Sequence, residues 1–150
     1  MLKARKIDHS KCANAVAIYD VFQRSYRVEA SFIGASDFPP LKRHYMAIAK
    51  AESEFYGLYH EARLAAVIEV QQTQGQLDIH SLTVDPDYFR QGLADKLLNY
   101  VLSLPSVKSA VVETAVANTP AIKLYEKHGF VEFKRWTPDH GIEKLALSRT

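Results

Sequence analysis

Hydrophobic side chains near the start of the chain repeat with the period of an α-helix. Apolar residues recur there at intervals of three and four and would share one helical face: Cys12, Ala15, Tyr19, Phe22 and Tyr26. We predict a helix over this stretch, with Asp8 or Ser10 as its N-terminal cap and Cys12 packed against the interior. Polar residues and Gly34 interrupt the pattern over residues 27–38, which predicts a loop.

Shorter runs rich in β-branched and aromatic residues predict strands separated by polar breaks. The predicted strands cover residues 2–7, 54–59, 64–70, 77–84, 110–117, 131–136 and 142–147. Gly75 lies in the polar break over residues 71–76, so we predict a hairpin turn there.

Three further helices are predicted from apolar spacing and from start and stop residues. They cover residues 41–51, 92–103 and 119–128. In the last of these, Thr119 is the predicted N-cap, Pro120 the first helical residue and Gly129 the stop. The alternation of helices and strands indicates a layered α/β fold of the α+β type.

Composition excludes several classes of protein. The 150 residues, 47% of them hydrophobic, predict a single domain over residues 1–150. One cysteine excludes an internal disulfide, and the histidines show no metal-ligand spacing, so we expect no metal. A net charge of +2 and scattered basic residues argue against a nucleic-acid surface. Without a long apolar run or a signal-peptide pattern, we expect a cytoplasmic protein with no membrane partner.

The stretch from Leu82 to Ala94 carries the most specific chemistry. A predicted strand ends at Val84, Pro86 fixes a turn, and a helix begins near Gly92. The first turn of a helix exposes up to about four unpaired N–H groups and carries about half a positive charge. Such a turn suits a phosphate or pyrophosphate. An ordinary strand–turn–helix connection is the alternative interpretation of this stretch taken alone.

The same stretch resembles the first signature of the Gcn5-related N-acetyltransferase (GNAT) family. That signature is a strand ending in Leu-x-Val, then Pro, then Arg/Gln-x-x-Gly-x-Gly/Ala opening a helix. The matching residues are Leu82, Val84, Pro86, Gly92 and Ala94. One position departs from the family pattern, because Phe89 stands where Arg or Gln is commonest.

A second family signature, Asn-x-x-Ala-x-x-Leu-Tyr-x-x-x-Gly-Phe, follows further along the chain. It appears as Asn118, Ala121, Leu124, Tyr125, Gly129 and Phe130. The order of elements also resembles the family over nearly the whole chain, although residues 27–60 match only in a general way.

The resemblance implies a mixed, V-splayed central sheet of about six to seven strands, flanked by about four helices. Acetyl-CoA would lie where the sheet opens, between the strands predicted at 77–84 and 110–117. The backbone of Leu82, Thr83 and Val84 would contact the pantetheine arm, with Asn118 nearby. The resemblance implies that amides of the following loop and helix hold the pyrophosphate: Arg90, Gln91, Gly92, Leu93, Ala94 and Asp95.

Direct acetyl transfer to an amine needs a base and an acid. A lysine-like amine is almost entirely protonated at neutral pH, and protonating the departing thiolate eases its release. By resemblance, Tyr125 is the predicted acid. His80 is one candidate base, because some arylalkylamine acetyltransferases resemble this chain in carrying a histidine there. Glu69, a carboxylate inside an apolar strand, is the other, because members of the family often place a base carboxylate on a central strand. The choice between the two stays open.

The predicted acceptor is a primary amine of a small molecule or of a protein. The resemblance implies that residues 27–40 and 137–141 shape its pocket, in which Glu29 would bind a cationic acceptor. A solvated loop carboxylate is the alternative for Glu29, and an acceptor site at a homodimer interface is left open. The alternative function is a catalytically silent acyl-CoA-binding regulatory module of the same fold. A third and more distant alternative is a structural interaction protein that binds no nucleotide.

Overall fold

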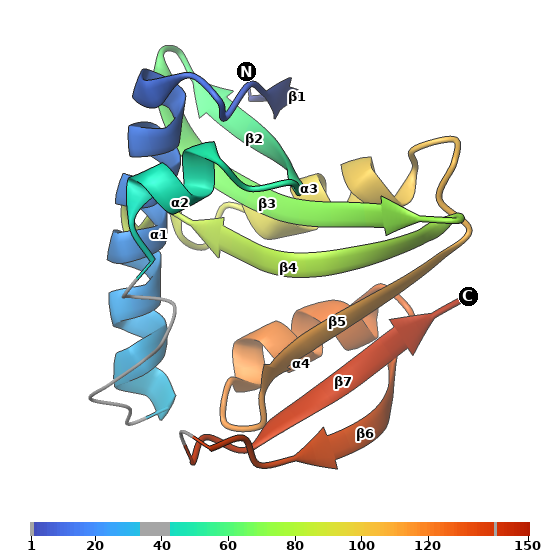
Figure 1. The fold of residues 1–150 in the computed structure, drawn as a ribbon. Coiled ribbons are helices and arrows are strands. Elements are labelled where there is room, and N and C mark those ends of the chain that lie inside the picture. Colours follow the sequence, from blue (N-terminus) through green and yellow to red (C-terminus); the bar gives the residue numbers. More distant parts are fainter. Residues whose placement is uncertain (1, 34–42, 140) are drawn as a thin grey trace.

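A mixed β-sheet of seven strands runs through the part of the chain that the structure describes, in the order β1-β2-β3-β4-β5-β7-β6 (Figure 1). The structure is a computed structural model that describes residues 2–33, 43–139 and 141–150. The strands are β1 (Lys3–Ile7), β2 (Glu54–His60), β3 (Arg63–Thr73), β4 (Gln76–Val84), β5 (Ser109–Ala115), β6 (Val131–Trp136) and β7 (Lys144–Arg149). The helices are α1 (Cys12–Ile33), α2 (Tyr45–Ala49), α3 (Leu93–Leu102) and α4 (Thr119–Lys127), with a 3-10 helix, η2 (Pro86–Tyr88), before α3. The expected layered α/β fold is confirmed.

The turn predicted at Gly75 is a two-residue hairpin that joins β3 to β4. Thr73 pairs with Gln76 across it, and Gln74 and Gly75 have φ angles of 51° and 85°. Two successive left-handed residues are what a type I′ turn requires, and its twist matches that of the flanking strands. The two strands therefore form one long antiparallel ribbon.

The sheet splits between β4 and β5, which are parallel. They pair only over Gln76–Ile79 and Ser109–Val112, although both strands continue further. Just beyond this pairing, β4 has one more residue than the facing part of β3, and the extra residue is His80. A β-bulge bends and twists its strand, which accounts for the divergence of β4 from β5. The V-shaped opening expected from the resemblance is confirmed.

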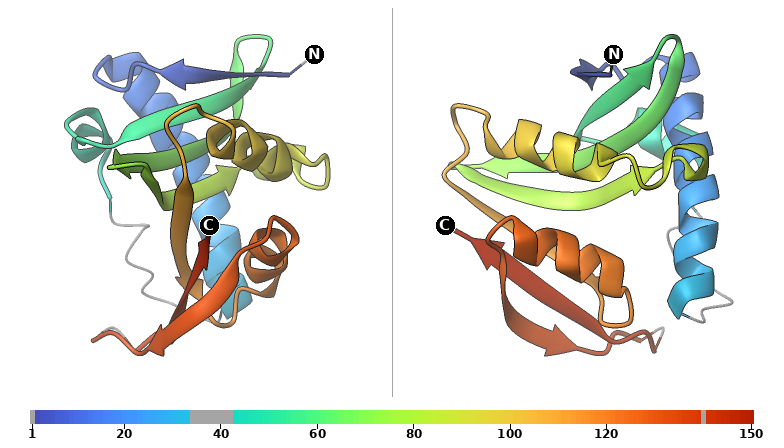
Figure 2. Two further views of the ribbon diagram at one scale, coloured as in Figure 1. Left: turned by 90° about the vertical axis from the view of Figure 1, so that its right-hand side faces the viewer. Right: turned by 180° about the vertical axis from the view of Figure 1, so that it is seen from behind.

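Helices cover both faces of the sheet. Helices α3 and α4 lie on one face, seen from behind in Figure 2, and contribute buried side chains such as Tyr125 to one core. Helices α1 and α2 enclose a second core around Phe22 and Phe55. Because side chains alternate along a strand, β3 directs Ile68 to the first core and the neighbouring Glu69 toward α1.

Helix α1 is longer than predicted, which corrects the assignment of residues 27–38 to a loop. It continues to Ile33, so Glu29 lies on a helix and not in a loop. The apolar stripe continues as well, because Ala30 is buried one turn after Tyr26. No glycine or proline interrupts the helix before it ends. The rest of that predicted loop lies outside the described residues.

Two helix starts also differ from the predictions. Cys12 is exposed, contrary to its expected packing, because it is the first residue of α1 and the buried stripe begins at Ala15. The N-cap of α4 is Asn118 and not Thr119, since the Asn118 side chain accepts a hydrogen bond from the backbone N–H of Ala121. An asparagine at this position satisfies a helix donor that would otherwise be unpaired.

Several elements have other boundaries than predicted, and strand β3 for one continues to Thr73, beyond the predicted end at residue 70. Helix α2 is shorter than the predicted 41–51, because His44 caps it and its side chain accepts the N–H of Met46. Residues 41 and 42 lie outside the described part of the chain. Strand β7 begins two residues later than the predicted 142–147, since its pairing with β5 starts at Lys144.

Candidate active site

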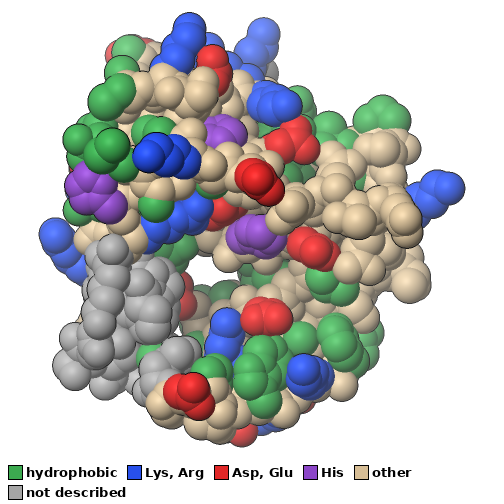
Figure 3. Space-filling view, in the orientation of Figure 1, with side chains coloured by type: hydrophobic (Ala, Val, Ile, Leu, Met, Phe, Trp, Pro, Cys, Tyr) green, Lys and Arg blue, Asp and Glu red, His purple; other side chains and the backbone are tan. Residues whose placement is uncertain are grey.

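The split sheet opens into a cleft of about 440 Å³ between the ends of β4 and β5. Figure 3 shows a hollow in the middle of this face of the molecule, with acidic, basic and histidine side chains around it. Helix α1, helix α4, strand β7 and the segment before α2 complete the walls. Five of the predicted site residues line this one cleft: Glu29, His80, Leu82, Asn118 and Tyr125.

Tyr125 reaches the cleft from α4 and is only 5% exposed. Its ring makes an edge contact with Phe130, at 5.5 Å between centroids. Burial, and then the nearby Glu29 and Tyr26, raise the pKa of Tyr125 well above its usual value. The hydroxyl therefore remains protonated at neutral pH and can act as a donor.

His80 projects from the bulge of β4 and lines the cleft. Its side chain is 40% exposed, and its Nδ1 lies 3.9 Å from Oε2 of Glu69. The extra residue of a bulge is unpaired in the ladder, which leaves its direction to be set by neighbouring side chains.

Glu69 lies behind the cleft wall and is fully engaged. Arg43 donates to both oxygens, from Nη1 to Oε1 at 2.6 Å and from Nη2 to Oε2 at 3.0 Å. Ser53 Oγ donates to Oε2 at 2.6 Å. Burial alone raises the pKa of Glu69, but the hydrogen bonds from Arg43 and Ser53 and the arginine charge bring it below its usual value. The carboxylate is therefore ionised at neutral pH.

Glu29 lines the opposite wall of the cleft, on α1. Burial raises the pKa of Glu29, and a hydrogen bond with Asn118 and the charge of Lys144 offset this only in part. Lys144 is itself paired with Glu113, at 3.2 Å between Nζ and Oε1. Burial disfavours the charged form of Glu29, and a cationic ligand placed beside the carboxylate would favour it.

The end of β4 presents backbone and one apolar side chain to the cleft. Leu82 lines the cleft, while the side chain of Thr83 is buried and its hydroxyl donates to the Val67 carbonyl at 3.4 Å. The contribution of Thr83 to the cleft is thus limited to its backbone. Val84 packs against the first core.

The loop before α3 has the backbone shape expected of an anion cradle. Gly92 is the N-cap of α3 with a φ of 73°, and it has no side chain to cap the first-turn amides. A Cβ at Gly92 would meet no described heavy atom within 4 Å, so the space beside it is open. Arg90 also has a positive φ, 65°, a strained conformation for a non-glycine residue. These features fit a pyrophosphate held by amides.

Asp95, in the first turn of α3, has its charge offset by two partners. His128 Nε2 lies 2.8 Å and Lys127 Nζ 3.1 Å from its Oδ1. The hydrogen bond with His128 lowers the pKa of Asp95 most, followed by that with Lys127, against the effect of burial. These contacts reduce the repulsion that Asp95 would exert on a phosphate near Gly92.

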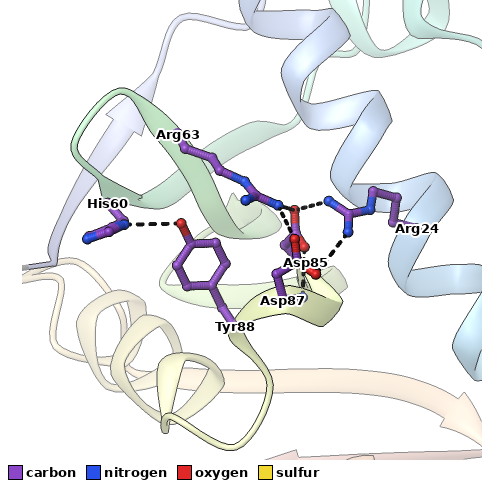
Figure 4. A network of polar contacts seen from close by, with 6 residues as sticks. All are labelled: Arg24, His60, Arg63, Asp85, Asp87 and Tyr88. Atoms are coloured by element: carbon purple, nitrogen blue, oxygen red, sulfur yellow. Dashed lines mark hydrogen bonds and ion pairs between the residues drawn. The ribbon is translucent and has the colours of Figure 1, made fainter.

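An ionic cluster ties the turn between β4 and α3 to helix α1 and strand β3 (Figure 4). Asp85 is buried and accepts hydrogen bonds from Arg24 of α1 at 2.8 Å and Arg63 of β3 at 2.9 Å. Arg63 also donates to Asp87 at 2.8 Å, and the Asp87 backbone N–H donates to Asp85 at 2.9 Å. The turn that leads to the anion cradle is therefore tied to two other elements.

Sequence reasoning missed several residues that line the cleft. They are Tyr26, Arg43, Ser81, Glu113 and Lys144. Tyr26 was assigned to the apolar stripe, where it is indeed buried, and its spacing of three from Glu29 on a helix was the available signal for a shared wall. Ser81 lies between the predicted site residues His80 and Leu82, whereas Arg43, Glu113 and Lys144 reach the cleft only through contacts between distant segments.

The chain matches the profile of the acetyltransferase (GNAT) family over residues 15–130, and it belongs to that family. It is 31% identical over 125 residues to UPF0157 protein YqkA of Bacillus subtilis, covering 83% of this chain and 36% of that protein. It is 34% identical over 80 residues to the ribosomal protein bS18-alanine N-acetyltransferase of Escherichia coli. That match covers 51% of this chain and 54% of the relative, so the chain spans only part of the curated relatives it matches.

Two solved structures share the fold. The Escherichia coli ribosomal-protein-S18-alanine N-acetyltransferase superposes with a TM-score of 0.77 at 22% identity, covering 99% of this chain and 93% of that one. The PaiA N-acetyltransferase of Thermoplasma acidophilum, in complex with coenzyme A, gives 0.72 at 14% identity, covering 100% and 99%. Among the described residues, no helix is long and apolar enough to cross a membrane.

Proposed function

We propose that this chain is an acetyl-CoA-dependent N-acetyltransferase that acts on a primary amine. The observation that carries the proposal is the cleft, because Leu82, Asn118 and Tyr125 from the two signature segments line it together with His80. Acetyl-CoA is the acetyl donor of the family, and one protein of the same fold was crystallised with coenzyme A.

The donor would bind along the free edge of β4. Beyond Ile79, β4 makes no ladder with β5 among the described residues, so its backbone polar groups are open to an extended ligand. We expect the pantetheine arm to pair with the backbone from Leu82 to Val84. The pyrophosphate would meet the amides near Gly92, with Arg90 and Gln91 alongside.

The reaction would be direct attack of the amine nitrogen on the acetyl carbonyl carbon. A C–N bond forms, the C–S bond breaks, and the amine loses one proton to a base. The leaving thiolate takes a proton from the Tyr125 hydroxyl, which the base refills through solvent after the transfer. His80 lines the cleft and is the base we favour, directly or through one water.

The acceptor would enter past α1, where Glu29 offers a carboxylate to a cationic group. An α-amino group has a pKa of about 7.7–8.0 and lysine about 10.4, so the α-amine supplies far more of the neutral form at neutral pH. Similarity to an alanine N-acetyltransferase also favours an α-amine acceptor over lysine. We therefore propose the α-amine of a peptide as the first acceptor to test, ahead of lysine and small amines.

The test is an acceptor screen with acetyl-CoA in which release of the free thiol is followed. The panel contains a peptide with a free N-terminal alanine, the same peptide with an acetylated N-terminus and an internal lysine, and a set of arylalkyl and aliphatic diamines. Amine-dependent thiol release with the first peptide is the expected result. Mass spectrometry of the product locates the acetyl group on the α-nitrogen or elsewhere.

Calorimetric titration with acetyl-CoA distinguishes the two ways in which this proposal could fail. Binding without turnover on any amine would favour the silent regulatory module. Absence of binding at concentrations of tens of micromolar would exclude both the enzyme and that module.

A further inference from the structure

Three features of the molecule coincide at one place in the cleft: the bulge of β4, the end of its pairing with β5, and a buried carboxylate. Ser81 pairs with Glu69 across the ladder, and its hydroxyl donates to Glu69 Oε1 at 3.3 Å. The imidazole of His80 faces the other oxygen, with Nδ1 at 3.9 Å from Oε2. One carboxylate thus contacts both the extra residue of the bulge and the residue that follows it.

The carboxylate is held rigidly from the opposite side. Arg43 binds both oxygens of Glu69, and Ser53 binds one of them from a buried position. The guanidinium of Arg43 lies 5.9 Å from the ring centre of Phe22 and 6.0 Å from that of Phe55. A bidentate pair of this kind fixes both the distance and the direction of the carboxylate.

The same contacts make Glu69 a poor acceptor for a substrate proton. A general base needs a free lone pair within reach of the amine and a proton affinity near the working pH. The oxygens of Glu69 already accept hydrogen bonds from Arg43, Ser53 and Ser81. Burial raises the pKa of Glu69, but the contacts with Arg43 and Ser53 bring it below its usual value, which moves it further from that requirement.

We propose that Glu69, held by Arg43, is a positioning residue that fixes the bulge of β4 and sets the orientation of His80 in the cleft. The inference rests on the proposed function for its consequence in catalysis. Removing Glu69 should slow the chemical step, because His80 loses its direction. Donor binding should survive, since the backbone from Leu82 to Val84 and the amides near Gly92 are separate contacts.

The kinetic test is a double-mutant cycle between Glu69 and His80. We expect Glu69→Gln to lower kcat about 10-fold to 100-fold, with the KM for acetyl-CoA changed less than about threefold. In a His80→Ala background, Glu69→Gln should cost less than about a further twofold, because the two residues act as one unit. An equal loss in both backgrounds would mean that Glu69 acts independently of His80 and would overturn the proposal.

Arg43→Gln separates positioning from proton transfer. If Glu69 were the base, loss of Arg43 would raise the proton affinity of the Glu69 carboxylate. Arg43→Gln would then not show the fall in kcat that Glu69→Gln shows. Positioning predicts a fall in kcat in the same direction as for Glu69→Gln. Should Arg43→Gln fail to fold, Ser53→Ala removes one hydrogen bond to the same carboxylate and should give a smaller fall. Glu132→Gln, which breaks an exposed pair with Arg135, is the matched control and should leave kcat unchanged.

A spectroscopic readout tests the positioning without any turnover. The imidazole Cε1–H resonance of His80, assigned from the His80→Ala spectrum, should change its chemical shift in Glu69→Gln and Arg43→Gln but not in Glu132→Gln. An unchanged resonance in Glu69→Gln would overturn the inference even if the protein is an active acetyltransferase. A changed resonance in a protein that acetylates nothing would support the positioning and remove the proposed function instead.

Discussion

The two walls of the cleft each carry a carboxylate, and the two carboxylates have opposite environments. On the β3–β4 wall, burial raises the pKa of Glu69, but the hydrogen bonds from Arg43 and Ser53 and the arginine charge together bring it below its usual value. On the α1 wall, burial dominates and raises the pKa of Glu29, with only Asn118 and Lys144 acting against it. Both groups are glutamates, Glu29 lining the cleft and Glu69 behind its wall, so the difference comes from their partners.

This difference assigns different tasks to the walls. A carboxylate bound by a guanidinium is charged, rigid and saturated, which suits it to hold another group in place. A carboxylate that is only partly compensated gains from a cation that arrives with the substrate. We therefore propose that proton handling lies on the β4 side, through His80, and recognition of the amine on the α1 side, through Glu29.

The largest expected effect is at Tyr125 of α4, whose pKa is raised first by burial and then by the nearby Glu29 of the α1 wall. Tyr125→Phe removes the proton donor but keeps the buried ring. We expect kcat to fall by a factor of about 10²–10⁴ while calorimetric affinity for acetyl-CoA changes less than about twofold. Unchanged turnover would remove Tyr125 from the acid role and leave the thiolate to be protonated by solvent.

Most of the fold could be predicted from local pattern. Alternating apolar runs predict the strands and Gly75 predicts the hairpin, whereas the split between β4 and β5 was implied only by the family resemblance. The end of α1 could not be predicted, because polar residues such as Glu29 lie on the side of the helix that faces the cleft. A polar interruption looks like a loop when the wall that it faces is unknown.

The candidate site was predictable only where one segment carries the signal. His80, Leu82 and Tyr125 belong to recognisable stretches and do line one cleft. The pairing of Arg43 with Glu69 joins residues 26 positions apart, and only the folded chain brings the segment before α2 beside β3. Without that contact, Glu69 looked like a free buried carboxylate and hence a candidate base.

The second prediction compares the stability of matched variants at neutral pH. Glu69→Gln leaves a half-buried Arg43 without its counter-charge, and we expect a loss of about 2–3 kcal/mol in the free energy of unfolding, less than for a fully buried pair. Glu29→Gln removes a poorly compensated charge and should be stabilising, or destabilising by less than about 0.5 kcal/mol. Urea unfolding measures both, and equal losses would contradict the assignment of different environments.

The third prediction follows the same two variants with pH. A lowered pKa in the folded state gives stability that is present above the ordinary glutamate value of about 4.3 and is lost as the pH falls through the folded value. The deficit of Glu69→Gln should therefore shrink between about pH 7 and about pH 3.5. A raised pKa costs stability as the pH rises, so Glu29→Gln should be relatively more stable at pH 7 than at pH 3.5. Parallel pH trends for the two variants would contradict the comparison.

The smallest expected effect is at Lys144, which pairs with Glu113 and also contributes to the charge balance of Glu29. Lys144→Gln breaks a largely exposed ion pair, so we expect a loss of no more than about 0.5 kcal/mol at low salt, fading at about 1 M salt. Part of that loss should vanish in a Glu29→Gln background, because the lysine then compensates one carboxylate instead of two. Additive losses in the double variant would show that Lys144 serves Glu113 alone, and that the α1 wall holds Glu29 with even less compensation than its surroundings suggest.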